Sequence, residues 1–80
     1  MSTRFVKFTD DKAANRAILA QNVEGIECTY AGAATAEDVD RALDVTPGQC
    51  GSAEHYSNGA RNIFIRNFRQ EVIGVVLVRP

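Results

Sequence analysis

The chain has 80 residues, of which 45% are hydrophobic and 24% are charged, and its formal net charge is −1. This length predicts a single small α/β domain over residues 1–80 and excludes two separate cores, while the apolar content excludes an intrinsically disordered chain. The N-terminus has no apolar signal segment, and the apolar run 72–78 is much shorter than the roughly 20 residues that cross a bilayer. We therefore expect a cytoplasmic protein with no membrane association.

Charge is divided unevenly along the chain. Residues 1–9 carry a net charge of +2, residues 10–54 carry nine acids against three cations, or −6, and residues 55–80 carry four arginines against one acid, or +3. If strands and helices form separate layers, this division predicts a basic side and an acidic side. The two sides would suit different partners.

The first part of the chain predicts a strand, a helix and a second strand. Residues 3–8 alternate between apolar and polar side chains, which is typical of a strand. Residues 9–11, Thr-Asp-Asp, offer N-cap candidates for a helix that ends near Asn22. Residues 24–31 alternate again and predict the second strand.

A capping box predicts where the second helix begins. Asp38 follows Thr35 by three residues, an acidic variant of the motif in which each side chain bonds the backbone N–H of the other residue. We expect this helix to bury Ala36, Val39 and Leu43. Its exposed charged side chains would be Glu37, Asp40, Arg41 and Asp44.

The last part of the chain predicts a loop followed by a β-hairpin. Residues 49–60 are rich in Gly, Ser and Asn and show no periodicity, which is typical of a loop. Residues 62–68 and 72–78 are rich in β-forming side chains and flank a short polar turn. Because 72–78 is apolar on both faces, we expect it in the interior of the sheet.

These elements predict an α+β fold of order β-α-β-α-β-β. We expect a two-layer sandwich in which both helices cover one face of a four-stranded mixed sheet that ends in the C-terminal hairpin. Pleating would place Val6, Ile63 and Ile65 under the helices and leave the opposite face open.

The open face of this sheet is the first candidate binding surface. It would interleave aromatic and cationic side chains, with Lys7, Phe64, Arg66 and Phe68 as the contact residues. Such a surface suits a protein partner. It also suits single-stranded nucleic acid, through base stacking and phosphate contacts, or the pairing of two copies in a homodimer.

The second helix is another candidate. Its four acids, Glu37, Asp38, Asp40 and Asp44, imitate the charge of a phosphate backbone and would occupy a basic groove on another protein. Small acidic proteins of phages and mobile elements inhibit nucleases or host defence complexes in this way. The alternative is an ordinary solvated helix whose N-terminal acids interact with the helix dipole.

Cys50 and His55 form the third candidate. An adjacent imidazolium lowers the pKa of a thiol, so a Cys–His pair in the 49–60 loop would define a small Cys-dependent enzyme. The spacing does not fit a papain-type protease, whose histidine lies more than about 100 residues after its cysteine. Together with Cys28 these residues lack the spacing of zinc ligands, so we expect two free thiols, no metal and no cofactor.

The sequence therefore predicts a non-enzymatic binding module that acts through protein–protein interaction. The expected role is inhibition, by a phage or mobile-element protein, of a host complex that handles nucleic acid or acts in defence. The alternatives are a single-stranded nucleic-acid-binding protein and a Cys-dependent enzyme.

Overall fold

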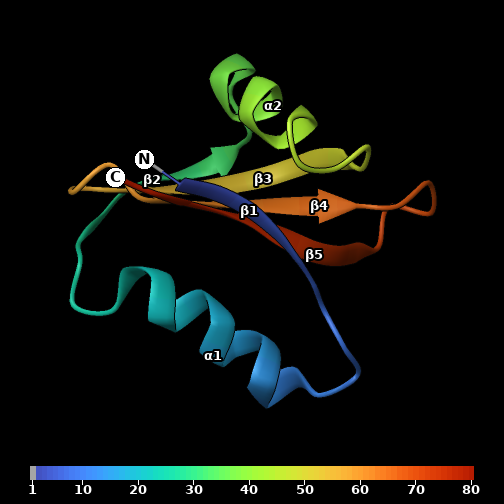
Figure 1. The fold of residues 1–80 in the computed structure, drawn as a ribbon, viewed down its shortest axis with the longest axis horizontal. Coiled ribbons are helices and arrows are strands. Elements are labelled where there is room, and N and C mark those ends of the chain that lie inside the picture. The colour runs from blue at the N-terminus through green and yellow to red at the C-terminus, as the bar shows by residue number, and fades with distance from the viewer. Residues whose placement is uncertain (1) are drawn as a thin grey trace.

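The computed structural model describes residues 2–80, which form two helices and one five-stranded antiparallel sheet (Figure 1). The strands are β1 (Ser2–Lys7), β2 (Cys28–Ala33), β3 (Gln49–Tyr56), β4 (Arg61–Arg66) and β5 (Val72–Arg79). The helices are α1 (Lys12–Val23) and α2 (Ala36–Leu43). The strand order is β1-β5-β4-β3-β2. The predicted α+β class and C-terminal hairpin are confirmed, whereas the four-stranded mixed sheet is wrong.

The additional strand is β3, which occupies most of the segment predicted as a loop. It pairs antiparallel with both β2 and β4, and β5 pairs antiparallel with both β1 and β4, so no neighbouring pair of strands in the described sheet is parallel. Its pairing with β4 is irregular between Cys50 and Ala53, where a Cβ on Gly51 would collide with the Arg66 side chain. The glycine and serine of this strand are weak β-formers, but partners on both sides satisfy its backbone hydrogen bonds.

The two helices cover opposite faces of the sheet, not a single face as predicted (Figure 1). In β4, Ile63 and Ile65 belong to the core on the α2 side, whereas the neighbouring Asn62 bonds Asn22 of α1. The reason is that β4 and β5 bury consecutive residues, whose side chains point to opposite faces. A sheet that is apolar on both faces requires a covering layer on each, so the domain has three layers.

The main core lies between α2 and the sheet. Its buried members are Ala42, Ala53, Ile63, Ile65, Val76 and Val78. Strand β5 contributes to it and also buries Val75 and Leu77 on the alternate positions. The expectation that 72–78 is an interior strand is confirmed, because β5 lies between β1 and β4.

Helix α1 is attached to the sheet through a polar contact. It begins after Asp11, whose side chain accepts a hydrogen bond from the Ala14 backbone N–H at 3.1 Å. The buried Asn22 donates from Nδ2 to Asn62 Oδ1 at 2.9 Å and accepts from Arg79 Nε at 2.9 Å. This chain of bonds fixes the C-terminal end of α1 over β4 and β5.

Neither described helix has both the length and the apolar character needed to span a membrane.

Candidate functional site on helix α2

The predicted capping box positions the first turn of α2. The Asp38 backbone N–H donates to Thr35 Oγ1 at 3.2 Å, and the Thr35 backbone N–H donates to Asp38 Oδ2 at 2.9 Å. Both donors belong to the free N–H groups of the helix start. The motif therefore turns the Asp38 side chain back toward the sheet, and this residue becomes the centre of the site.

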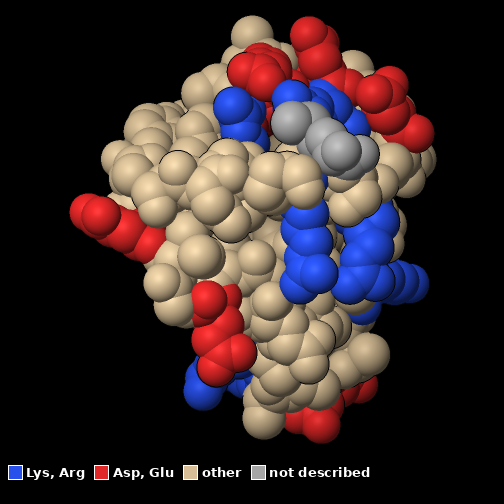
Figure 2. Space-filling model, turned by 60° about the vertical axis from the view of Figure 1, so that its left-hand side comes forward, with Lys and Arg blue, Asp and Glu red and all other residues tan. Residues whose placement is uncertain are grey.

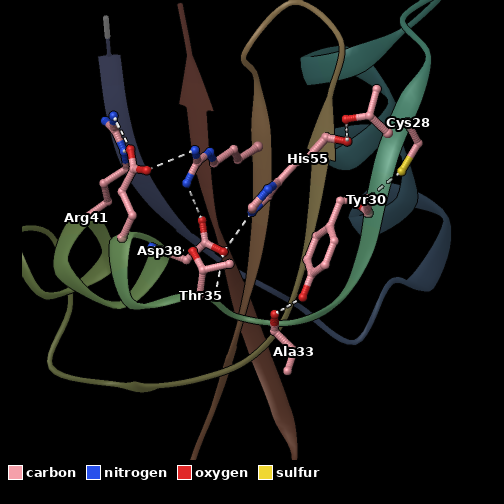
Figure 3. A network of polar contacts seen from close by, with 10 residues as sticks. Cys28, Tyr30, Ala33, Thr35, Asp38, Arg41 and His55 are labelled. Atoms are coloured by element: carbon pink, nitrogen blue, oxygen red, sulfur yellow. Dashed lines mark hydrogen bonds and ion pairs between the residues drawn. The ribbon is translucent and has the colours of Figure 1, made fainter.

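Asp38 is completely buried and connects α2 to two strands (Figure 3). Its Oδ2 atom lies 2.8 Å from His55 Nε2 on β3, and its Oδ1 atom accepts from Arg61 Nη1 on β4 at 2.7 Å. His55 and Arg61 are direct partners in the β3–β4 register. Burial alone would raise the pKa of Asp38, but the hydrogen bonds from Thr35, His55 and Arg61 outweigh it and lower the pKa.

The aromatic surroundings of His55 complete this network. The ring of Tyr30, on the edge strand β2, packs against the imidazole with a centroid separation of 4.8 Å. The Tyr30 hydroxyl donates to the Ala33 carbonyl at 2.6 Å, which holds the ring in place (Figure 3). His55 therefore lies between Tyr30 and Asp38 as a link between β2, β3 and α2.

A second acid of the predicted set is also neutralised. Glu37 accepts from Arg41 at 3.0 Å and from Arg61 at 3.3 Å. The bond from Arg41, followed by the charge of Arg61, lowers the pKa of Glu37. Two of the four predicted contact acids thus serve intramolecular contacts, and the prediction that Asp38 lies on the partner surface is wrong.

The outer surface of α2 differs from the predicted one. Val39 is 38% exposed and Leu43 is 62% exposed, although the apolar pattern predicted that both are buried. The buried residues of the helix are Asp38 and Ala42. The bonds of Asp38 to β3 and β4 determine this rotation of the helix, and they turn the larger apolar side chains toward solvent.

Asp40 and Asp44 remain as unneutralised acids on the same surface. Neither carboxylate makes a hydrogen bond or ion pair with any residue from 2 to 80. Acidic side chains gather at the end of the molecule that carries α2, as Figure 2 shows. We call Val39, Leu43, Asp40 and Asp44 the α2 outer surface.

The open sheet face predicted from the sequence does not exist as one surface. Lys7 pairs with Gly74 and lies on the same side as Phe5 and the α2 core, whereas Phe64 follows Asn62 on the α1 side. The register of β1 against β5 therefore separates Lys7 from Phe64. In addition, α1 covers part of the face that carries Phe64.

Arg66 and Phe68 lie at the β4–β5 turn. Arg66 donates from Nη1 to the Gln70 carbonyl at 2.7 Å and so stabilises the turn. Phe68 is 83% exposed, and the Arg69 guanidinium lies 5.4 Å from the centre of its ring. Of the predicted sheet-face contacts, Lys7 and Phe68 are exposed, whereas Phe64 and Arg66 are half-buried.

Cys50 and His55 do not form a hydrogen-bonded pair within the described structure. The Nε2 atom of His55 bonds Asp38, and burial, with the negative charge of Asp38, raises the pKa of the Cys50 thiol. A raised pKa reduces the thiolate population, which is the opposite of what activates a nucleophilic cysteine. Both cysteines are free thiols. Residues 2–80 contain no cluster of three or more His, Cys, Asp or Glu side chains that would hold a metal ion.

Sequence reasoning identified Asp38 through the capping box but missed its partners. His55 appeared in the sequence as a loop residue, and Arg61 as one of several arginines. The missing information was the β3–β4 register, which places both side chains under the first turn of α2.

These features define a small three-layer α+β domain with a polar network under one exposed helix. Comparison of the chain with known protein families, characterised proteins and solved structures finds no match.

Proposed function

We propose that this protein is a non-enzymatic binding module that contacts a protein partner through the α2 outer surface. The observation that supports the proposal is the orientation of α2, which buries the charged Asp38 and leaves Leu43 62% exposed. Fully burying one Leu or Val side chain stabilises a fold by about 1.5–3 kcal/mol. An orientation that gives up part of this stabilisation is expected where the apolar side chains contact a partner.

The anchoring of α2 supports the same proposal. The capping box fixes the first turn, and the bonds of Asp38 to His55 and Arg61 fix the helix on β3 and β4. A surface that is already ordered loses little conformational entropy on binding. The module would therefore act by occluding a surface of its partner, which is how an inhibitor of a host complex would work.

The geometry favours no second candidate function. A stacking surface for single-stranded nucleic acid would need Lys7, Phe64 and Arg66 on one open face, and the register places Lys7 on the opposite face from Phe64. A gel shift with single-stranded RNA and DNA at low salt provides the check. Retention of either nucleic acid, with its loss in Phe64→Ala, would overturn the proposal.

The proposal is tested by affinity capture from the native host with three forms of the protein. The wild type and Phe68→Ser should retain the same protein, and Leu43→Ser should lose it. Because Leu43 and Phe68 are both exposed, the two variants should melt at nearly the wild-type temperature. If every protein retained by the wild type is also retained by Leu43→Ser, the proposal is wrong.

A further inference from the structure

The α2 outer surface consists of two parallel rows of side chains. Val39 and Leu43 are four residues apart and form an exposed apolar row along the helix. Asp40 and Asp44 have the same spacing and form an acidic row beside it, because Asp40 and Leu43 are neighbours at i and i+3. Because the acidic row lies on one side of the apolar row only, the charge pattern restricts how a partner can be oriented on this surface.

The charges around these rows give the surface its selectivity. Arg41 and Arg61 both form ion pairs with Glu37, and Arg61 also forms one with Asp38. The carboxylates of Asp40 and Asp44 make no hydrogen bond or ion pair with any residue from 2 to 80. No Lys or Arg side chain among residues 2–80 therefore occupies the place of an external cation at this row.

We infer that the α2 outer surface takes a protein partner with an apolar groove bordered on one side by Lys or Arg side chains. This inference rests on the proposed function and adds the chemistry of the partner. The groove would receive Val39 and Leu43, and two cations about one helical turn, or 5.4 Å, apart would face Asp40 and Asp44. This is the helix-in-groove mode of recognition.

Other occupants fit the charge pattern less well. Nucleic acid and anionic lipid are repelled by unneutralised carboxylates. A second copy that packs α2 antiparallel against α2 would bring the two acidic rows to the same side of the contact, and in a parallel copy no Lys or Arg of the α2 outer surface would face either row. An apolar groove with Lys or Arg along one border is complementary to both rows.

The test uses synthetic helical peptides of about 14 residues, or four turns, because the natural partner is unidentified. The first contains Leu and Lys in adjacent i, i+4 rows, the second replaces Lys by Glu, and the third replaces Leu by Ala. Amide chemical shifts of the protein map the contact, and fluorescence anisotropy of labelled peptide gives the affinity. The Leu/Lys peptide should bind most tightly and shift the amides of residues 39–44.

Variants of the protein separate the contributions of the two rows. Asp40→Asn with Asp44→Asn should weaken the Leu/Lys peptide about tenfold, the size expected for two exposed ion pairs, and added salt should reduce the difference. Leu43→Ser should weaken the same peptide, and Phe68→Ser should leave its affinity unchanged. All substituted side chains are exposed, so the variants are expected to fold as the wild type does.

The inference is overturned if the Leu/Glu or Ala/Lys peptide binds as tightly as the Leu/Lys peptide, or if the shifts lie at the β4–β5 turn. Dimerisation that requires Leu43 would assign the surface to a second copy and would also overturn it. The capture experiment distinguishes a failure of this inference from a failure of the proposed function. If Leu43→Ser releases a captured protein but the Asp40/Asp44 variant does not, binding through α2 stands and the basic groove does not.

Discussion

The Oδ2 atom of Asp38 and the Nε2 atom of His55 lie 2.8 Å apart, and this contact connects the first turn of α2 to β3. The other oxygen of the same carboxylate bonds Arg61 on β4. One buried charge thus holds the helix on two strands. It also decides which side of α2 faces the sheet, and therefore which side chains a partner can contact.

Asp38→Asn should destabilise the fold by about 3–5 kcal/mol, because it leaves the Arg61 charge without its buried partner. Urea unfolding followed by circular dichroism measures the change. Asp40→Asn is the matched control on the exposed side of the same helix and should change the free energy of unfolding by less than about 0.5 kcal/mol. Equal effects of the two substitutions would show that the network does not anchor α2.

Stability should fall in acid because of Asp38. Its pKa is lowered in the folded state from an ordinary value of 3.8, so as the pH falls the unfolded chain takes up the proton first. The stabilisation by the carboxylate is therefore complete above about pH 5 and is lost as the pH falls through the folded-state pKa.

Unfolding free energies measured across this acid range test the assignment. The decline should be shallower in Asp38→Asn than in the wild type, because that variant has no group to protonate at this site. Glu37→Gln is a second comparison, since Glu37 also has a lowered pKa but lies at the surface. A decline of the same steepness in Asp38→Asn and the wild type would refute the role of Asp38.

Asn22→Ala should loosen α1. The substitution removes the donor to Asn62 Oδ1 and the acceptor for Arg79 Nε, and an unsatisfied buried polar group costs about 1–3 kcal/mol. Amide hydrogen exchange should accelerate in α1 more than in β4. Gln21→Ala is the control, because the Gln21 side chain is exposed and makes no hydrogen bond to a described residue, while its backbone carbonyl keeps the bond from Arg79. Unchanged protection of α1 in Asn22→Ala would mean that apolar packing alone holds the helix.

Gly74→Ala should disrupt the pairing of β1 with β5. A Cβ at this position would collide with the Phe5 ring and with the Val6 backbone carbonyl, which cannot move without shifting β1. Overpacking of this kind costs about 1–3 kcal/mol. Val72→Ala, at the partly exposed start of the same strand, should cost less. Thermal unfolding of the two variants checks that Gly74→Ala loses more stability than Val72→Ala. A Gly74→Ala variant as stable as the wild type would show that β1 can shift without loss of stability.

The parts of this protein that are visible in the sequence depend on local groups. Thr35 and Asp38 lie three residues apart and form the capping box by themselves, and the alternation in 3–8 and the two-sided apolar character of 72–78 identify strands without any partner. The hairpin of β4 and β5 is local in the same sense. These interactions close over a few residues, so the amino-acid order is sufficient to predict them.

The remaining features were decided by contacts between distant residues. Gln49–Tyr56 is a strand because β2 and β4 pair with it on both sides, although its own residues favour a loop. Val39 and Leu43 are exposed because Asp38 bonds side chains 17 and 23 residues away, which the apolar period of α2 does not encode. Sequence alone thus determined where α2 begins and that it is acidic. The tertiary structure decided which of its faces meets solvent, because the long-range hydrogen bonds of one buried carboxylate determine the rotation of a short helix.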